Sequence, residues 1–258
     1  MTADRRSAAA SRIAPRNSPS ASQTARATLR LREMIIDGHF HPGERIKEIP
    51  LAAQLEVSRI PLRLALERLA HEGLLEIRPT RGFVVPQFSK TDIYDAIELR
   101  GLLEGAAARL AAERLRDSRD LAPLREASRE MDGLLRDRKL GLDTFTQYIE
   151  LNAKFHAALL DLSHSRILRR ALKQACALPF ASPSAFLLKQ HSAAEAIDLF
   201  LIALDQHRGI IDAIANRESM RAELLAREHA RVARRNLDAA LSNRELLKSV
   251  RGARLIQL

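Results

Sequence analysis

The apolar positions of this chain recur at helical spacing over most of its length, and the pattern is sharpest between residues 51 and 72. There, four apolar residues occupy the i, i+3, i+4 and i+7 positions of one helix face: Leu62, Ala65, Leu66 and Leu69. A shorter apolar stripe starts at Leu51. Between the stripes, Ser58 is a favourable N-cap, and Pro61 falls in a first helical turn, where no N–H donor is needed. The pattern therefore predicts two helices joined by a tight turn, a helix-turn-helix.

The first turns of the second predicted helix carry side chains that suit DNA recognition. Arg59 and Arg63 are four residues apart, so they share a face beside the apolar one. A recognition helix enters the major groove by its N-terminal end, and the fork of an arginine can bind both acceptors of a guanine. We therefore expect Ser58, Arg59 and Arg63 to contact DNA.

Two short runs rich in apolar residues, 74–78 and 83–85, follow at once and predict a β-hairpin with its turn at 79–82. A hairpin directly after a recognition helix is typical of the wing of a winged helix-turn-helix, and a plain surface hairpin is the alternative. The residues of the hairpin that we expect to reach DNA are Arg78, Thr80, Arg81 and Gly82.

From about residue 90 onward the pattern is helical almost throughout. Helices are expected over residues 91–115, 119–138, 144–162, 165–178, 184–190, 193–216 and 218–248. The predicted fold is therefore mainly α, with an N-terminal winged helix-turn-helix and a C-terminal all-α helical bundle. The expected boundaries are 1–23 for a basic tail, 24–86 for the winged helix-turn-helix, 87–90 for a linker and 91–248 for the bundle.

The segment 1–23 is rich in Ser, Ala, Arg and Pro and lacks helical periodicity, so we expect it to be disordered. A tail without function is the favoured interpretation. A basic arm that contacts DNA phosphates and an Arg-rich transit peptide are the alternatives.

Charge and composition narrow the class of protein. The formal net charge is +10, and residues 1–90 hold 15 Lys/Arg against 9 Asp/Glu. The basic excess is concentrated around the helix-turn-helix, which suits a polyanion, although many soluble proteins are basic. No apolar run has the length of a membrane span, and the single cysteine, Cys176, excludes an intramolecular disulfide framework. We therefore expect a cytoplasmic protein with no membrane partner.

Two sets of residues carry a resemblance to known families. The first set is Pro42-Gly43-Glu44-Arg45-Ile46, Leu51-Ala52, Val57-Ser58-Arg59, Pro61-Leu62-Arg63, Ala65-Leu66, Leu69, Glu72-Gly73-Leu74 and Arg81-Gly82. It is similar to the DNA-binding domain of the GntR family of bacterial regulators. The second set is Asp92-Ile93, Leu99-Arg100, Leu102-Leu103-Glu104, Ala107-Ala108, Phe155-His156-Ala157-Ala158-Leu159 and Ser163-His164-Ser165. It is similar to the FCD effector domain of the FadR-type subfamily.

The recognition helix departs from the family pattern at two polar positions. In the family it usually opens Ser-Arg-Thr-Pro-Val-Arg-Glu-Ala-Leu, whereas here Ile60 replaces the Thr and Leu64 replaces the Glu. Some relatives also carry a DNA-contacting arginine at the position of Ile49. These losses of polar groups are expected to affect which operator sequence is recognised, rather than whether DNA is bound. We expect Leu64 to be exposed, or to pack against the wing or another domain.

We expect the helical domain to dimerise. The resemblance implies that this domain binds a small ligand, often a carboxylate, and that in many members the site contains a metal held by one Asp and three His. The matching positions here are Asn152, His156, His207 and His229. Each lies on an apolar stripe of its predicted helix, which points it into the bundle. The alternative for each histidine is a core residue bonded to a backbone carbonyl or a carboxylate. Three imidazoles and an oxygen suit Zn²⁺ or Ni²⁺, held more weakly with Asn152 in place of Asp.

Arg100 matches an arginine on the first helix of the effector domain. Together with Asn152 it is the expected effector-binding residue, because a guanidinium can bind a carboxylate through two hydrogen bonds. A surface ion pair with Glu104, four residues further on, is the alternative.

The leading hypothesis is a ligand-responsive transcription regulator and not an enzyme. It would be a repressor that binds a palindromic double-stranded DNA operator as a homodimer, since two recognition helices read two half-sites. One alternative is a metal-dependent enzyme domain fused to a DNA-binding domain. Another is a constitutive DNA-binding protein whose bundle only dimerises.

Overall fold

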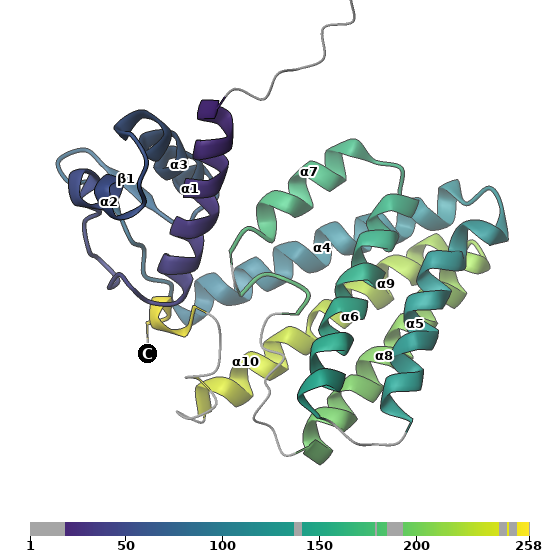
Figure 1. The fold of residues 1–258 in the computed structure, drawn as a ribbon. Coiled ribbons are helices and arrows are strands. Elements are labelled where there is room, and N and C mark those ends of the chain that lie inside the picture. Colours follow the sequence, from purple (N-terminus) through teal and green to yellow (C-terminus); the bar gives the residue numbers. More distant parts are fainter. Residues whose placement is uncertain are drawn as a thin grey trace, which may run out of the picture.

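The computed structural model describes residues 19–136, 141–178, 180–184, 193–242, 247 and 252–257. Within these residues the chain forms a small N-terminal domain next to a larger bundle of helices (Figure 1). The long helix α4 (Lys90–Arg114) begins beside the N-terminal domain and runs through the bundle. The predicted fold class, a winged helix-turn-helix followed by an all-α domain, is confirmed.

The N-terminal domain contains the predicted helix-turn-helix and wing. Its elements are α1 (Pro19–Ile36), α2 (Glu48–Gln54), α3 (Arg59–His71), β1 (Glu76–Arg78) and β2 (Gly82–Val84). β1 and β2 are antiparallel, with Ile77 opposite Phe83. The apolar stripe of α3 is buried against α1, which fixes the opposite face of α3 toward solvent.

The turn between α2 and α3 depends on a strained backbone position. Glu56 has a φ of 52°, in the left-handed region that a residue other than glycine adopts at a cost of about 1–3 kcal/mol. The backbone N–H groups of Glu56 and Val57 donate to Ala53 O and Ala52 O, at 3.2 Å and 3.1 Å, and so close the end of α2. This closure reverses the chain within a few residues and projects the start of α3.

Some predicted boundaries in this domain are wrong. Helix α1 begins at Pro19, so residues 19–23 are helical although the sequence analysis assigned them to the tail. Proline at a first helical position is favourable, since its fixed φ suits the helix and no donor is needed there. The rest of the predicted tail, residues 1–18, lies outside the described residues. The first strand of the wing is shorter than the predicted 74–78, and the second begins and ends one residue earlier than the predicted 83–85.

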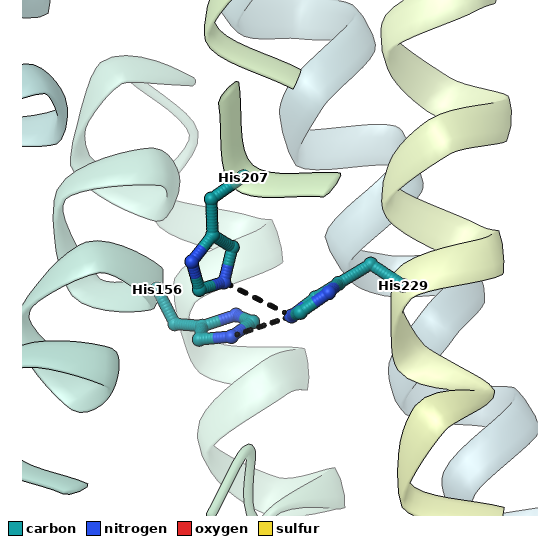
Figure 2. Close-up of side chains that lie close together, drawn as sticks. All are labelled: His156, His207 and His229. Atoms are coloured by element: carbon teal, nitrogen blue, oxygen red, sulfur yellow. Dashed lines mark hydrogen bonds between the residues drawn. The ribbon is translucent and has the colours of Figure 1, made fainter. Parts of the chain in front are cut away.

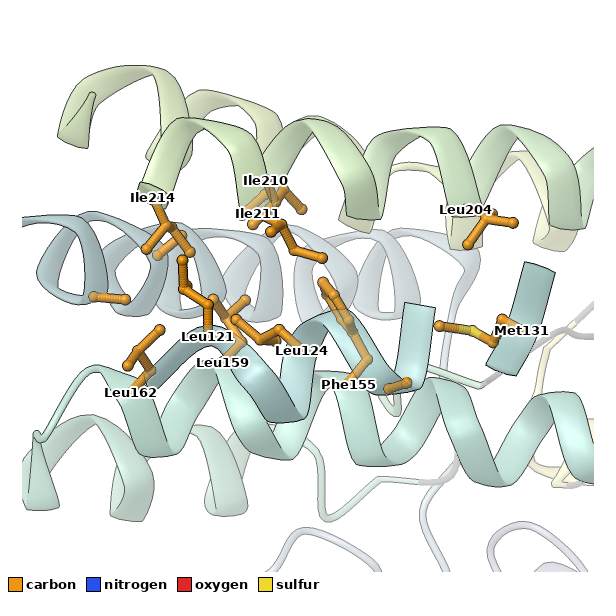
Figure 3. Packing of buried hydrophobic residues seen from close by; sticks show 14 of the residues in the cluster. Leu121, Leu124, Met131, Phe155, Leu159, Leu162, Leu204, Ile210, Ile211 and Ile214 are labelled. Atoms are coloured by element: carbon orange, nitrogen blue, oxygen red, sulfur yellow. The ribbon is translucent and has the colours of Figure 1, made fainter. Parts of the chain in front are cut away.

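The bundle contains α4, η1 (Ser118–Leu121), α5 (Ala122–Leu135), α6 (Leu142–Leu162), α7 (Arg166–Ala175), α8 (Ala193–Ala215), α9 (Ser219–Ala230) and α10 (Val232–Ser242). Its core lies between α4, α5, α6, α8 and α9 (Figure 3). Helices α4 and α9 pack closely because α4 has glycines where they meet. A Cβ atom on Gly101 would lie 3.0 Å from Ala230 Cβ, and one on Gly105 would lie 2.7 Å from Arg227 Cγ.

The sequence predicted one helix over 218–248, whereas the structure breaks it at Arg231 into α9 and α10. At the break the N–H of Arg234 donates to Arg231 O at 3.0 Å, and the guanidinium of Arg100 donates to Ala230 O at 3.1 Å. The carbonyl of Ala230, which in a continuous helix would accept from the N–H four residues later, thus accepts from the buried side chain of Arg100. The prediction over 119–138 is likewise divided into η1 and α5, and the one over 184–190 lies almost entirely outside the described residues.

Residues 252–257, which we call the C-terminal strap, join the two domains. Phe88, in the linker, donates its N–H to Leu255 O and accepts from the N–H of Gln257, both at 2.7 Å. Leu255 is fully buried among the core residues of the N-terminal domain, while Ile256 packs in a second core that includes Ile93 of α4. One short segment therefore contributes to the packing of both domains. No helix in the described part of the chain is long and apolar enough to cross a membrane.

Candidate metal centre and DNA-binding surface

Three buried histidines from three helices point their rings at one place (Figure 2). His156 comes from α6, His207 from α8 and His229 from α9. The Nε2 atom of His229 lies 3.1 Å from His207 Nε2 and 3.3 Å from His156 Nε2. The three predicted histidines are therefore brought together, as a group that could hold a metal ion.

The helices place these rings by ordinary core packing. His156 follows Phe155, which is fully buried in the core of the bundle and stacks on the ring of His207 with 3.9 Å between centroids. The rings of His156 and His229 are also stacked, 5.2 Å apart. Packing against Phe155 and stacking of two of the rings on each other therefore help to hold the rings in position.

Burial keeps at least two of these imidazoles neutral. It lowers the pKa of His207 well below the ordinary value, and the neighbouring histidines add to this effect. Burial, followed by repulsion from His156, lowers the pKa of His229 to about 3. A neutral imidazole offers a free lone pair on one nitrogen, which is the form that binds a metal.

Two of the three Nδ1 atoms have neighbours of the kind found behind metal-bound histidines, whereas the buried Nδ1 of His207 has no hydrogen-bond partner in the described part of the chain. His229 Nδ1 lies 2.9 Å from the amide oxygen of Gln206, and His156 Nδ1 lies 3.0 Å from Glu104 Oε1, although without the alignment of a good hydrogen bond. A proton on each Nδ1 leaves the Nε2 lone pairs facing one another. Such lone pairs repel, and a shared cation would satisfy them, so the donor set fits a metal.

Glu104 is the residue of this site that the sequence analysis did not identify as part of it. Burial opposes its ionisation, but attraction to His156 and Arg100 outweighs this and lowers its pKa to about 2. From the sequence, Glu104 was predicted only as an alternative surface partner of Arg100. The ion pair exists, with 3.7 Å between Arg100 Nε and Glu104 Oε2, but both side chains are buried, so its predicted surface location is wrong. The sequence signal for this ion pair was the i, i+4 spacing of Arg100 and Glu104 along α4.

The guanidinium of Arg100 is held by backbone carbonyls of residues far along the chain. One of its terminal nitrogens lies 2.5 Å from Ser182 O and 3.4 Å from Ala181 O, and the other donates to Ala230 O. It also lines a cavity of about 20 Å³. The other residues around this cavity are Tyr148, Asn152, Pro183, Ala203, His229, Val232, Ala233 and Asn236.

Asn152 is buried one turn before His156 on α6 and lines the same cavity as His229. Its amide nitrogen lies 3.4 Å from Pro183 O and 3.3 Å from Ser184 Oγ. Asn152 thus lies on the same cavity as His229 and Arg100. Metal coordination by its oxygen stays a prediction. Asn236 also faces the cavity, with a buried side-chain oxygen that has no hydrogen-bond partner in the described part of the chain.

The residues predicted to touch DNA form the exposed surface of α3 and the wing. All of them are exposed: Ser58, Arg59, Arg63, Arg78, Thr80, Arg81 and Gly82. Ser58 is the N-cap residue of α3 but makes no side-chain cap hydrogen bond, which leaves its hydroxyl free for another partner. Ile60 and Leu64 are exposed on the same helix, so of the alternatives for Leu64 the structure supports exposure. DNA contact by these residues stays a prediction.

Comparison with known proteins assigns both domains. The family model of bacterial regulatory proteins, gntR family, matches residues 23–85. The FCD domain matches residues 95–232, more than half of the chain. The protein belongs to the GntR family. This GntR protein has the FCD domain of the FadR-type subfamily, and the family and its named relatives are transcriptional regulators rather than enzymes.

Individual relatives of this GntR protein agree with that assignment. It is 39% identical over 140 residues to the Nta operon transcriptional regulator of Aminobacter aminovorans and 35% identical over 143 residues to the transcriptional regulator YdhC of Bacillus subtilis. These matches span 54% and 55% of this chain, and 63% and 62% of the relatives, under two thirds of their length. The solved structure of Escherichia coli McbR/YncC matches with a TM-score of 0.56 and 25% identity, over 85% of this chain and 97% of that one.

The DNA-binding surface of this GntR protein gives a first prediction. Arg59→Ala or Arg63→Ala is expected to weaken operator binding by about 1–3 kcal/mol and to relax preference at one base pair, because each exposed side chain is predicted to read base edges. Arg81→Ala, at the wing, should weaken binding with less change in preference and a flatter salt dependence. Fluorescence anisotropy with operator variants at several salt concentrations measures both effects.

Arg119→Ala removes an equal charge from an exposed position in the bundle and serves as the control. Normal operator binding by both α3 variants would contradict the assignment of α3.

Proposed function

We propose that this protein is a transcriptional repressor whose helical domain binds a small carboxylate beside a divalent metal. It binds a palindromic operator as a homodimer in the cytoplasm, and the carboxylate releases it. The observation that carries the proposal is the group of buried histidine rings, which borders a cavity that also receives a guanidinium.

The metal would be held by His156, His207 and His229, with the oxygen of Asn152 as a further ligand. Imidazole nitrogens suit Zn²⁺ or Ni²⁺ better than Mg²⁺. When bound, the cation supplies positive charge beside the cavity. Gln206 lies within hydrogen-bond distance of His229 Nδ1, and the carboxylate of Glu104 lies beside His156 Nδ1, so both would favour the orientation that presents the Nε2 atoms inward.

The cavity combines groups that suit an anionic ligand with a hydroxyl. Arg100 can bind a carboxylate through two hydrogen bonds, and the unpaired oxygen of Asn236 can accept one from a hydroxyl of the ligand or from water. Since Arg100 is already charged and buried, a carboxylate gains a strong interaction there without the cost of bringing in a new cation.

Repression is the proposed mode because every residue expected to touch DNA is exposed on the N-terminal domain, away from the effector cavity. Binding of the operator then needs no ligand, and the ligand acts by shifting the protein away from the DNA-competent state. Homodimerisation is proposed because a single winged helix-turn-helix reads one half-site only.

The proposal is tested by measuring operator affinity with chelator-treated protein, with Zn²⁺ or Ni²⁺, and with each metal plus a series of small carboxylates. A thermal-shift screen selects the carboxylates, because a specific ligand raises the melting temperature by mass action. We expect at least one carboxylate to weaken operator binding more in the metal-loaded protein. If every carboxylate left operator affinity unchanged with and without metal, a constitutive DNA-binding protein would be the better interpretation.

A substitution at Asn152 separates the role of the metal from that of the effector. Asn152→Asp adds a negative oxygen beside the proposed cation, so Zn²⁺ should bind about tenfold more tightly or better. The added charge partly neutralises the cation, so a carboxylate effector should bind more weakly. Isothermal titration calorimetry measures both. Asn216→Asp adds the same charge at an exposed position and should change neither affinity. Unaltered Zn²⁺ binding in Asn152→Asp would show that residue 152 is not a ligand.

A further inference from the structure

The cavity beside the histidines is too small for the ligand that we propose, and this inference rests on that proposed function. Its volume of about 20 Å³ holds roughly one water molecule. Most of its wall consists of residues on packed helices, which resist displacement. The exception is Pro183, which belongs to the non-helical segment after α7. We call the described part of that segment, residues 176–178 and 180–184, the connector.

At the cavity, the connector is held by the same groups that would bind an effector. Arg100 donates to the carbonyls of Ala181 and Ser182, and the amide of Asn152 lies within 3.4 Å of Pro183 O. A carboxylate forms stronger, charge-assisted hydrogen bonds with a guanidinium than a carbonyl does. A carboxylate that binds Arg100 therefore competes directly with the connector.

At its other end, the connector and the last turn of α7 hold the C-terminal end of α3. Gln174 donates from its amide nitrogen to His71 O at 2.5 Å. Arg32, on α1, donates to Ala177 O at 3.4 Å and also pairs with Glu72, the C-cap residue of α3. Helix α7 directs its C-terminal end toward the N-terminal domain (Figure 1). The connector and the last turn of α7 thus reach the recognition helix at the end opposite to the one expected to face DNA.

Apolar contacts also join the connector to the N-terminal domain and to the linker. Leu178 packs against the core of the N-terminal domain and against the core formed by Ile93 and Phe180. The ring of Phe180 is fully buried and meets Phe88 of the linker edge-to-face, with 4.8 Å between centroids. Movement of the connector would disturb both the support of α3 and the linker.

We propose that the connector couples the effector cavity to the recognition helix. A carboxylate at Arg100 displaces the connector from the cavity, the hold on His71 and Glu72 is loosened, and α3 changes its orientation relative to the bundle. The operator favours the docked connector and the effector favours the displaced one, so each ligand weakens the binding of the other.

The only cysteine in the sequence reports the state of the connector without any engineering. Cys176 lies at its start and is partly buried, and burial raises the pKa of its thiol to about 12, so it should react slowly with Ellman's reagent while the connector is docked. We expect acetate or succinate to raise the labelling rate several-fold over chloride at the same ionic strength, and the operator to lower it. An unchanged rate under carboxylate concentrations that release the operator would overturn the coupling.

A double-mutant cycle tests the coupling with no effector present. Arg100→Lys keeps a positive charge beside Glu104 but cannot donate to the same set of carbonyls, and Gln174→Ala removes the hydrogen bond to α3. We expect Arg100→Lys to weaken operator binding by roughly 5- to 150-fold, the usual range of allosteric coupling. In the Gln174→Ala background it should have little further effect, because the path is already cut. Additive effects of the two substitutions would overturn the proposal.

Controls keep the cycle interpretable. Ile167→Ala changes an exposed residue at the far end of α7, and Arg100→Lys should retain its full effect in that background. If Arg100→Lys does not fold, as judged by circular dichroism, Asn152→Ala replaces it in the cycle. This substitution removes the other contact between the cavity and the connector, and it is measured in chelator-treated protein. A carboxylate effect on operator affinity that is equal in wild type and in Gln174→Ala would overturn the connector and leave the proposed function intact. A non-additive cycle without any carboxylate effect would support the connector and count against the proposed effector.

Discussion

Replacing His207 by alanine is expected to reduce Zn²⁺ or Ni²⁺ binding by more than about 100-fold, since loss of even an outer partner of a metal ligand commonly costs 10- to 100-fold. His207 is fully buried, and its Nε2 atom lies 3.1 Å from that of His229, so its removal opens one side of the proposed site. The response to carboxylates should weaken with the metal. Operator binding without effector should persist, because α3 and the wing are exposed on the other domain.

Calorimetry with metal and anisotropy with operator measure the two parts of this prediction. His164→Asn is the matched control, since His164 is an exposed histidine with a φ of 48°, which asparagine tolerates. The control should bind metal and effector normally. If His207→Ala retained full metal binding or a full effector response, the three histidines would be core residues rather than ligands.

Replacing Glu104 by glutamine is expected to lower the free energy of unfolding by roughly 3–5 kcal/mol, because it leaves the buried charge of Arg100 without its carboxylate. Both side chains of this pair are only 2–3% exposed. The same substitution removes the carboxylate behind His156, so metal affinity should fall by about 10- to 100-fold. Urea unfolding followed by circular dichroism measures the first effect, and competition with a chelator measures the second.

The same helix offers a matched control for this change. Glu113 pairs with Arg109 at 2.8 Å, again four residues apart on α4, but these side chains are 42% and 35% exposed. Glu113→Gln should therefore cost no more than about 0.5 kcal/mol and leave metal affinity unaltered. Equal losses of stability in the two variants would mean that burial of the Arg100–Glu104 pair has no energetic consequence.

The parts of the fold that could be predicted from the sequence are those with local signals. The apolar stripe of α3 and the wing after it were recognisable because side-chain spacing and turn residues define them within a short segment. The histidines were recognisable because each lies on an apolar stripe and matches the family pattern. Their convergence through Nε2 atoms could not be derived from spacing, since it depends on how α6, α8 and α9 pack.

Glu104 and the connector were missed for related reasons. Helix α4 is rich in alanine and glycine and packs against several neighbours, so its sequence gives no clear division into buried and exposed faces. A charged pair on such a helix resembles an ordinary surface pair. The sequence from 176 to 184 contains prolines and serines, which indicated a break between helices and nothing more. The contacts of the connector with Arg100, and of the end of α7 with His71, are made between residues far apart in the chain, and no local pattern encodes them.

The C-terminal strap has a consequence for how a newly made chain acquires its activity. Domains generally fold in order as they leave the ribosome, with the N-terminal one first. Here the N-terminal domain lacks part of its core until Leu255 has been synthesised, after all of the described helices. A chain whose synthesis stops within the bundle therefore carries its recognition helix on an incompletely packed support. The packing of the DNA-binding domain is therefore complete only after the helical domain has been synthesised.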